Sequence, residues 1–383
     1  MFRHIIFLIF ESIILLPLLL FALIKGKIKK KYDVGLGPLP LISNVYHKKA
    51  LENKGYKVVT FALGHYHITN DFDYVFFLKS KKLINVNKLL TAYRLLDISL
   101  SAKIIYIYFD GGPIGIYSKF LWKLEPLIFK IAKVKTVLLG YGGDVQDLKF
   151  INNLKFKNSI INDYPNHKFR RNIISKKIDL WCQEGDHVIS GCDWVDNVFH
   201  WDTLMLSHFS IDTNVTLKKT TNTKNLKVLH APNHKSIKGT KFLKRAITRL
   251  NKKGYPIELI LVEKQPNEKV LELIQEVDII ADQFIIGWYA MFAIEAMNLS
   301  KPVMCYLRED LIDLYESDGI IKEGEIPIIN TSIKKIEENL IWAYNNKDKL
   351  KEIGTNSREF VKKYHSLECI GDIFESINKK LGI

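Results

Sequence analysis

The sequence predicts an α/β protein built from two doubly wound, Rossmann-like domains that face a cleft between them. Three observations support this fold class. Short apolar, β-rich runs alternate with helical runs on both sides of one polar stretch, residues 213–225. These runs are apolar almost throughout, which is typical of parallel strands covered on both faces. With 383 residues, the chain is also too long for one small hydrophobic core.

An apolar segment of twenty residues, 5–24, precedes the first domain and contains one charged residue, Glu11. It is long enough to cross a bilayer, and five lysines follow it within residues 25–31. The positive-inside rule predicts that this basic flank is cytoplasmic, so residues 1–31 are expected to be an uncleaved membrane anchor. We expect Glu11 to be protonated, paired, or near the surface of a helix that lies in the interface. A buried helix of the globular body is the alternative.

The first domain is predicted over residues 32–212, and its strands are expected to be parallel. Helical stretches lie between several of them. The predicted strands are 57–61, 74–78, 103–109 and 135–139, and the predicted helices are 43–53 and 116–132.

The second domain is predicted over residues 226–383, after a linker at 213–225. Asn267 is expected to cap a helix, and most of the chain after residue 333 is expected to be helical. In each domain the cleft should face the carboxyl ends of the strands. The predicted strands are 226–229, 257–262, 278–280 and 302–306, and a helix is expected over 289–299.

The net charge of +15 favours anionic partners, such as phosphate-bearing ligands or anionic lipid. A nucleic-acid partner is not expected, because the sequence has no recognisable nucleic-acid motif and no basic arm within the body. No two of the four cysteines have the Cys-x-x-Cys spacing of a zinc or redox site, so we expect reduced thiols and no metal site.

The loop HAPNHKSIKGT, residues 230–240, joins a predicted strand to a predicted helix. Free backbone N–H groups and the helix dipole favour a phosphate at such a position. Lys238 adds a positive charge, Gly239 allows close approach of the backbone, and Asn233 and His234 add donors. A solvated connection with ordinary lysines is an equally weighted alternative on position alone.

Three further places could carry chemistry. Glu295 interrupts a strongly apolar helix, where a carboxylate needs a partner and could accept hydrogen bonds from sugar hydroxyls. Gly35 and Gly37 could form a glycine turn that holds a phosphate or sugar, although no obvious strand precedes them.

The third place is the glycine-rich stretch 139–145, which follows a predicted strand. Tyr141 and Asp144 are expected at the carboxyl end of that strand. Asp110 has the same placement after the preceding strand. Both aspartates are candidate cleft carboxylates, and each could instead stabilise a turn.

Taken together and in this order, these motifs resemble the group 1 (family 4) glycosyltransferases of the GT-B fold, over nearly the whole chain after the anchor. Residues 233–239 (NHKSIKG) resemble the family's loop that ends in Lys-Gly, with Asn233 where an arginine is usual. The segments 294–297 (IEAM) and 300–303 (SKPV) resemble its Glu-Ala-Met…Gly-x-Pro-Val signature. Gly287 stands where the family often has a second glutamate, and Tyr141 stands where a histidine is usual.

Two other segments add to the resemblance. Residues 35–40 and the helix after them resemble the family's first loop, which faces the donor phosphate and the acceptor. Residues 208–212 (HFSID) resemble the short segment that precedes the second domain.

The resemblance implies a retaining, metal-independent glycosyltransferase that uses a nucleotide-diphosphate sugar as donor and has no other cofactor. The apolar segment adds the expectation of a glycan or lipid-linked acceptor in surface polysaccharide or glycolipid synthesis. The implied catalytic residues are Lys238, Asp144 and Tyr141, and the implied donor-binding residues are Gly35, Gly37, Asn233, His234, Lys238, Gly239, Gly287 and Glu295. The alternatives are an epimerase-like enzyme of the same fold and a non-catalytic, membrane-anchored sugar-binding protein.

Overall fold

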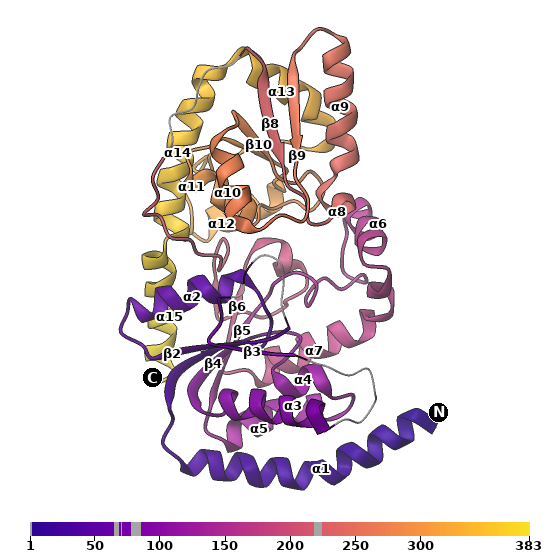
Figure 1. Ribbon diagram of the computed structural model, residues 1–383, viewed down its shortest axis with the longest axis vertical. Coiled ribbons are helices and arrows are strands. Elements are labelled where there is room, and N and C mark those ends of the chain that lie inside the picture. Colours follow the sequence, from indigo (N-terminus) through magenta and orange to yellow (C-terminus); the bar gives the residue numbers. More distant parts are fainter. Residues whose placement is uncertain (1, 65–68, 70, 78–85, 218–223) are drawn as a thin grey trace.

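Two parallel β-sheets organise the chain in the computed structural model, one in each half of the molecule (Figure 1). The structure describes residues 2–64, 69, 71–77, 86–217 and 224–383. We call the residues around the first sheet the N-terminal half and those around the second sheet the C-terminal half. The predicted linker 213–225 lies partly outside the described residues.

The sheet of the N-terminal half has seven strands in the order β3-β2-β1-β4-β5-β6-β7, all parallel. Its strands are β1 (Tyr32–Leu36), β2 (Val58–Leu63), β3 (Tyr74–Phe76), β4 (Ala102–Tyr108), β5 (Lys135–Leu139), β6 (His187–Ser190) and β7 (Thr203–Leu204). Its helices are α1 (Phe2–Lys27), α2 (Ile42–Glu52), α3 (Val86–Ser99), α4 (Pro113–Tyr117), η1 (Leu121–Leu124), α5 (Glu125–Ile131), α6 (Leu154–Asp163), η2 (Pro165–Phe169), α7 (Arg171–Glu184) and η3 (Cys192–Asp196).

The sheet of the C-terminal half has five parallel strands in the order β12-β11-β10-β8-β9. Its strands are β8 (Leu226–His230), β9 (Ile257–Leu261), β10 (Ile279–Ala281), β11 (Val303–Cys305) and β12 (Ile329–Asn330). The helices are α8 (Lys235–Lys238), α9 (Thr240–Lys252), α10 (Asn267–Gln275), α11 (Met291–Asn298), α12 (Glu309–Ser317), η4 (Ile333–Lys335), α13 (Ile336–Asn345), α14 (Lys347–His365) and α15 (Leu367–Lys380). All strands predicted from the sequence are present within a few residues.

Four local predictions need correction. Gly35 does not form a turn, because it lies inside the central strand β1, where a Cβ atom would come within 3.3 Å of the Ala102 Cβ. The central strand β1 and the short strands β6, β7 and β12 were not predicted. The segment 116–132 is not one helix but divides into α4, η1 and α5. Asn267 is the first residue of α10 rather than its cap, which is Pro266.

The C-terminal helix returns to the N-terminal half. α15 packs against α2, and Phe374 and Ile377 join the core that covers one face of the seven-stranded sheet. The Tyr106 hydroxyl donates a hydrogen bond to the Asn378 side-chain oxygen at 2.8 Å. Figure 1 shows α14 running beside the second sheet and α15 beside the first. The predicted domain boundaries stay a prediction, but the last helix contributes to the first core.

The apolar N-terminal helix α1 lies along the outside of the N-terminal half, beside α5 and far from the second sheet (Figure 1). Glu11 is buried there, and its carboxylate accepts hydrogen bonds from the backbone N–H groups of Lys119, Phe120 and Leu121 and from the Ser118 hydroxyl. Burial raises the pKa of Glu11, but these hydrogen bonds outweigh it and lower the pKa below its usual range. Of the expected outcomes for Glu11, the paired one is confirmed.

Candidate functional site in the cleft

The order of the strands identifies where a ligand should bind in each half. The first sheet reverses its winding between β1 and β4, and the second between β8 and β10. Ligands of open α/β sheets bind outside the carboxyl ends of the strands at such switch points. The loop 230–240 follows β8, and Asp282 follows β10 directly, so both lie at the second switch point.

The loop after β8 is fixed at its start by His230, which is fully buried. Its Nδ1 lies 2.7 Å from the carbonyl oxygen of Ala281, and its Nε2 lies 2.8 Å from the Thr240 hydroxyl. Burial lowers the pKa of His230 to about 4, so the ring is neutral, with Nδ1 donating to the carbonyl and Nε2 accepting from the hydroxyl. One side chain thus joins β8, the end of β10 and the start of α9.

Lys238 is the last residue of α8, and its ammonium nitrogen lies 2.6 Å from Oδ1 of Asp282. The Asp282 side chain is completely buried, whereas the Lys238 side chain is 15% exposed. A buried carboxylate requires a partner, and Lys238 supplies it. The ammonium group is therefore held at the switch point, with a small part of its surface open to a ligand.

The amino terminus of α8 is occupied by a residue of the N-terminal half. The Asp163 carboxylate accepts hydrogen bonds from the backbone N–H groups of Ser236 and Ile237, at 3.3 and 2.8 Å. Next to it, the Tyr164 hydroxyl is hydrogen-bonded to His234 Nε2, and the two rings lie 4.5 Å apart. Asn233 is exposed. His234 and the α8 N–H groups therefore connect the two halves in this structure.

Two of the predicted donor-binding glycines have left-handed backbone conformations. Gly239 has φ +80° and ends α8, and a Cβ atom there would lie 3.3 Å from the Ile285 side chain. Gly287 has φ +110°, and a Cβ atom there would come within 2.6 Å of the Arg308 side chain. Arg308 thus fills the space beside the position where the resembled family often has a glutamate. Its guanidinium pairs with Asp196 of the N-terminal half and with Asp310.

Glu295 lies on α11 and is only 4% exposed. Burial raises the pKa of Glu295 to about 7; a hydrogen bond from Asn267 opposes this shift, and the negative charge of Asp282 adds to it. Burial and the charges of Glu295 and Asp212 also raise the pKa of Tyr46, on α2 of the N-terminal half. The structure therefore brings Glu295 close to the Lys238–Asp282 pair and to the N-terminal half.

In the N-terminal half, Asp110 follows β4 and forms the centre of a polar network. Its Oδ2 accepts a hydrogen bond from the Tyr141 hydroxyl at 2.8 Å, and its Oδ1 lies 2.5 Å from the Arg170 guanidinium. The Lys177 ammonium donates to the Asp110 carbonyl oxygen at 2.6 Å. Burial and the charge of Asp110 raise the pKa of Tyr141, so this hydroxyl keeps its proton. Tyr141 and Asp110 follow neighbouring strands, as the sequence predicted, and the hydrogen bond between them was not predicted.

The structure places Asp144, a predicted catalytic residue, where its carboxylate meets backbone groups. The side chain is 1% exposed, and its two oxygens accept hydrogen bonds from the backbone N–H groups of Phe109, Tyr141 and Gly142. Burial raises the pKa of Asp144 to about 7, and these backbone bonds act in the opposite direction. The carboxylate joins the loop after β5 to the end of β4. This placement agrees with the alternative that Asp144 stabilises a turn.

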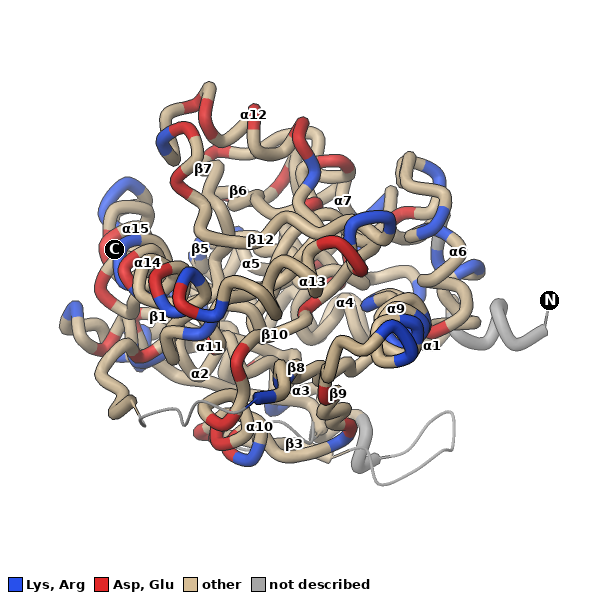
Figure 2. Tube along the Cα trace, turned by 90° about the horizontal axis from the view of Figure 1, so that it is seen from above, with Lys and Arg blue, Asp and Glu red and all other residues tan. Residues whose placement is uncertain are grey.

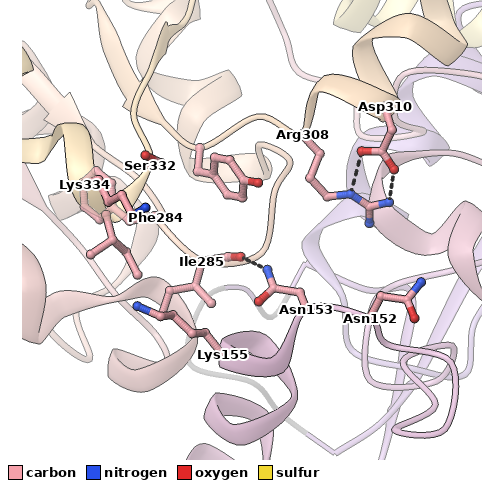
Figure 3. Close-up of a pocket in the computed structure, with 11 residues that line it drawn as sticks. Asn152, Asn153, Lys155, Phe284, Ile285, Arg308, Asp310, Ser332 and Lys334 are labelled. Carbon is pink, nitrogen blue, oxygen red and sulfur yellow. Dashed lines mark hydrogen bonds and ion pairs between the residues drawn. The ribbon is translucent and has the colours of Figure 1, made fainter.

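A cavity of about 550 Å³ opens between the halves (Figure 3). Its walls come from the segments that follow β10, β11 and β12 and from the start of α6, and Asn153 donates to the Ile285 carbonyl oxygen across it at 2.7 Å. Lys238 and Glu295 do not line it, but its Phe284–Ile285 wall packs on Gly239. The lining residues are Asn152, Asn153, Lys155, Phe284, Ile285, Tyr306, Arg308, Asp310, Ser332, Ile333 and Lys334.

Asp282, Arg170, Lys177 and Arg308 were missed by reasoning from the sequence. Asp282 had a usable signal, because it directly follows a predicted strand just as Asp110 does. The others lie on or beside helices where basic residues are ordinary, so only the three-dimensional contacts identify them.

Comparison with known proteins supports the fold. No known family model matches the sequence, and no curated protein matches it either. Among solved structures, sucrose-phosphate synthase from Thermosynechococcus elongatus matches with a TM-score of 0.58 and 11% identity, covering 92% of this chain and 99% of that one.

Two further solved structures are similar over most of their length. HepE from Anabaena, in complex with UDP and glucose, has a TM-score of 0.55 and 11% identity over 90% of this chain and 98% of its own. An α-glucosyltransferase in complex with UDP and DNA has a TM-score of 0.55 and 10% identity, covering 91% of this chain and 99% of its own. The chain therefore has the GT-B fold of these glycosyltransferases.

Proposed function

We propose that this protein is a glycosyltransferase that moves a sugar from a nucleotide-diphosphate sugar to a glycan or lipid-linked acceptor. The observation that carries the proposal is the Lys238–Asp282 pair at the second switch point of a GT-B fold, with the Asp282 charge acting on the buried Glu295. HepE in complex with UDP-glucose, and the α-glucosyltransferase in complex with UDP, support a donor of this class.

In this proposal, the ammonium group of Lys238 binds the donor diphosphate and stabilises the negative charge that develops as the sugar bond breaks. Asp282 holds the ammonium group in place. Glu295 accepts hydrogen bonds from the ribose hydroxyls. Because an ammonium group can stabilise negative charge on the leaving diphosphate, we propose a metal-independent reaction, and we propose retention of the anomeric configuration.

The acceptor is proposed to bind on the N-terminal side of the cleft, near Asp110 and Tyr141. The Asp110 carboxylate, held by Tyr141 and Arg170, would orient an acceptor hydroxyl by hydrogen bonding. Gly37 lies at the first switch point; a Cβ atom there would come within 2.3 Å of the Phe61 carbonyl oxygen, so only glycine fits this close approach. Gly35 lies two residues earlier, inside β1, and allows close packing of β1 against Ala102 of β4.

Donor binding is testable by thermal stabilisation with a set of common sugar nucleotides. We expect one donor class to stabilise the protein, and turnover of that donor to require an added acceptor. Turnover without an acceptor to a new sugar nucleotide would indicate the epimerase-like alternative. Binding without turnover for any acceptor would indicate a sugar-binding protein. The Arg308 side chain favours this alternative, because it fills the space beside Gly287, where the resembled family often has a glutamate.

The ionisation of Glu295 should control donor affinity. The pKa of Glu295 is raised to about 7, so the carboxylate is mostly ionised at pH 8 and mostly protonated at pH 6. Only the ionised form accepts hydrogen bonds from ribose hydroxyls through both oxygens, so affinity for a sugar nucleotide such as UDP-glucose should fall roughly tenfold from pH 8 to pH 6. Calorimetric titration at several pH values measures this change.

The matched variant for that experiment is Glu295→Gln, which keeps the shape and removes the titration. Its affinity should be weaker than that of the native protein at pH 8 and should not change down to pH 6. An equal pH dependence in both proteins would assign the effect to another group and remove Glu295 from the proposed ribose site.

A further inference from the structure

The helix α1 has two faces of opposite character. At about 100° per residue, Glu11, Leu18 and Ala22 point toward the N-terminal half, where Ala22 is completely buried. The opposite face is exposed to solvent and consists of large aliphatic side chains, which we call the apolar stripe. Its members are Ile9, Ile13, Leu16, Leu20, Leu23 and Ile24.

The buried face is fixed to the N-terminal half at two places. Toward the middle of α1, the Glu11 carboxylate accepts four hydrogen bonds from residues 118–121. Near the end, Lys25 pairs with Asp97 at 2.8 Å, and the Lys30 ammonium donates to the carbonyl oxygens of Leu100 and Ala132 at 2.7 Å. About 21 Å of helix lies between Glu11 and Lys25, so the carboxyl-terminal part of α1 is held against the N-terminal half.

These contacts are incompatible with a helix that crosses the bilayer away from the domain. Such a helix would carry the Glu11 carboxylate into hydrocarbon, where an unpaired charge is costly. It would also leave the backbone N–H groups of Lys119, Phe120 and Leu121 without their acceptor. By length and composition α1 could span a membrane, and it is the one such helix among the described residues. Its packing favours a different arrangement.

The apolar stripe continues onto neighbouring elements and ends in a basic region. Tyr93 of α3 is exposed and lies beside Phe21 of α1, with ring centroids 5.2 Å apart, and Leu89 and Leu90 of α3 are exposed as well. Beyond the carboxyl-terminal end of the stripe, a few residues after Phe21, Lys27, Lys29 and Lys31 are all exposed, with exposed Ile28 between Lys27 and Lys29. Aliphatic side chains bordered by lysines are complementary to an anionic lipid surface.

We propose that α1 lies in the plane of the membrane interface, with its Glu11 face packed on the N-terminal half and its apolar stripe inserted into an anionic bilayer surface. In this arrangement both ends of the helix stay on the same side of the membrane as the rest of the protein. The inference concerns the attachment of the chain and does not depend on the proposed glycosyl transfer.

Vesicle flotation of the purified full chain tests the stripe. Vesicles with about one third anionic lipid should bind the protein roughly tenfold more strongly than purely zwitterionic ones. The triple variant Ile13→Asn, Leu16→Gln, Leu20→Asn should lower binding by roughly tenfold or more, with an unchanged melting temperature. The matched control is Leu154→Gln with Phe199→Gln, which removes two comparably exposed apolar side chains elsewhere and should bind as the native protein does.

Two outcomes would overturn the role of the stripe. One is equal vesicle binding by the native protein and the triple variant. The other is a native protein that ignores vesicles but forms a dimer in gel filtration that the triple variant does not form, because a second copy would then cover the stripe. Donor binding measured on the same samples should be unchanged in every variant, which separates this inference from the proposed function.

The orientation is tested with an amino-terminal epitope tag on protein added to preformed sealed vesicles. In the native protein, added protease should remove the tag completely, because an in-plane helix leaves it outside. In Glu11→Ala, which loses the docking contacts and the only charge of the segment, part of the tag should become protected. Protection of the tag in the native protein would show that the helix spans and would refute the proposal.

Discussion

Replacing Lys238 with alanine should abolish measurable turnover of the sugar nucleotide and should also destabilise the fold. The loss of turnover is expected because the ammonium group is the proposed partner of the leaving diphosphate. The loss of stability is expected because the completely buried Asp282 carboxylate would lose its 2.6 Å partner, which costs about 3 kcal/mol at sites of this kind. Initial rates and urea unfolding measure the two effects.

A second variant separates the two effects, since the single substitution impairs both. Lys238→Met with Asp282→Asn removes both charges while keeping similar side-chain shapes, so its stability should return to within about 1 kcal/mol of the native protein. Its donor affinity should remain at least tenfold weaker. Lys244→Ala, which changes an exposed lysine on α9 (Figure 2), serves as a control and should alter neither property. Native donor affinity in the double variant would contradict the diphosphate role of Lys238.

Replacing Glu125 with alanine should destabilise the N-terminal half by about 4 kcal/mol. Glu125 is completely buried, and its carboxylate accepts hydrogen bonds from the backbone N–H groups of Gly112, Ile114 and Gly115 at 2.7–3.0 Å. Burial raises the pKa of Glu125 to about 7, and the backbone bonds oppose that rise. Without the side chain, three buried donors lose their acceptor, at about 1–3 kcal/mol each before relaxation. Urea unfolding followed by tryptophan fluorescence measures the change, because Trp181 lies beside this loop.

Glu184→Ala is the matched control for Glu125. Glu184 is an exposed glutamate on α7 that pairs with Lys130 at the surface at 3.5 Å, so its loss should change stability by less than about 0.5 kcal/mol. The Glu125 variant should also lose activity, because the loop that it holds carries Asp110. A Glu125→Ala protein as stable as the control would show that the loop is supported without the carboxylate.

Much of the fold could be predicted because its strands are nearly continuous apolar runs. The runs at 103–109 and 135–139 correspond to β4 and β5, which are central and covered on both faces. β1 escaped prediction because it begins with Tyr32 and Asp33 and contains Gly35, so its composition resembles a turn. β7 and β12 have two residues each, which is too short to show the alternation of apolar and polar residues that identifies a strand.

The candidate site could be predicted only in part, because a sequence gives the position of a side chain but not its partner. Lys238 and Glu295 could be proposed from their positions beside strands and helices. The pairing of Lys238 with Asp282 spans 44 residues, and the use of Asp144 by three backbone N–H groups depends on how two loops meet. The same holds for Glu11. The sequence does not explain a carboxylate in an apolar segment, because its hydrogen-bond donors are residues 118–121, more than 100 positions away.

The return of α15 to the first sheet constrains how the cleft can open. The backbone passes between the halves at residues 208–212 and again at 365–366, and these two crossings touch, since the Ile211 N–H donates to the His365 carbonyl oxygen at 2.8 Å. Two adjacent crossings act as a pivot, so the halves can rotate about one axis there but cannot slide past each other. Asp163 with α8 and Arg308 with Asp196 also join the halves, and a rotation that opens the cleft would have to break both contacts.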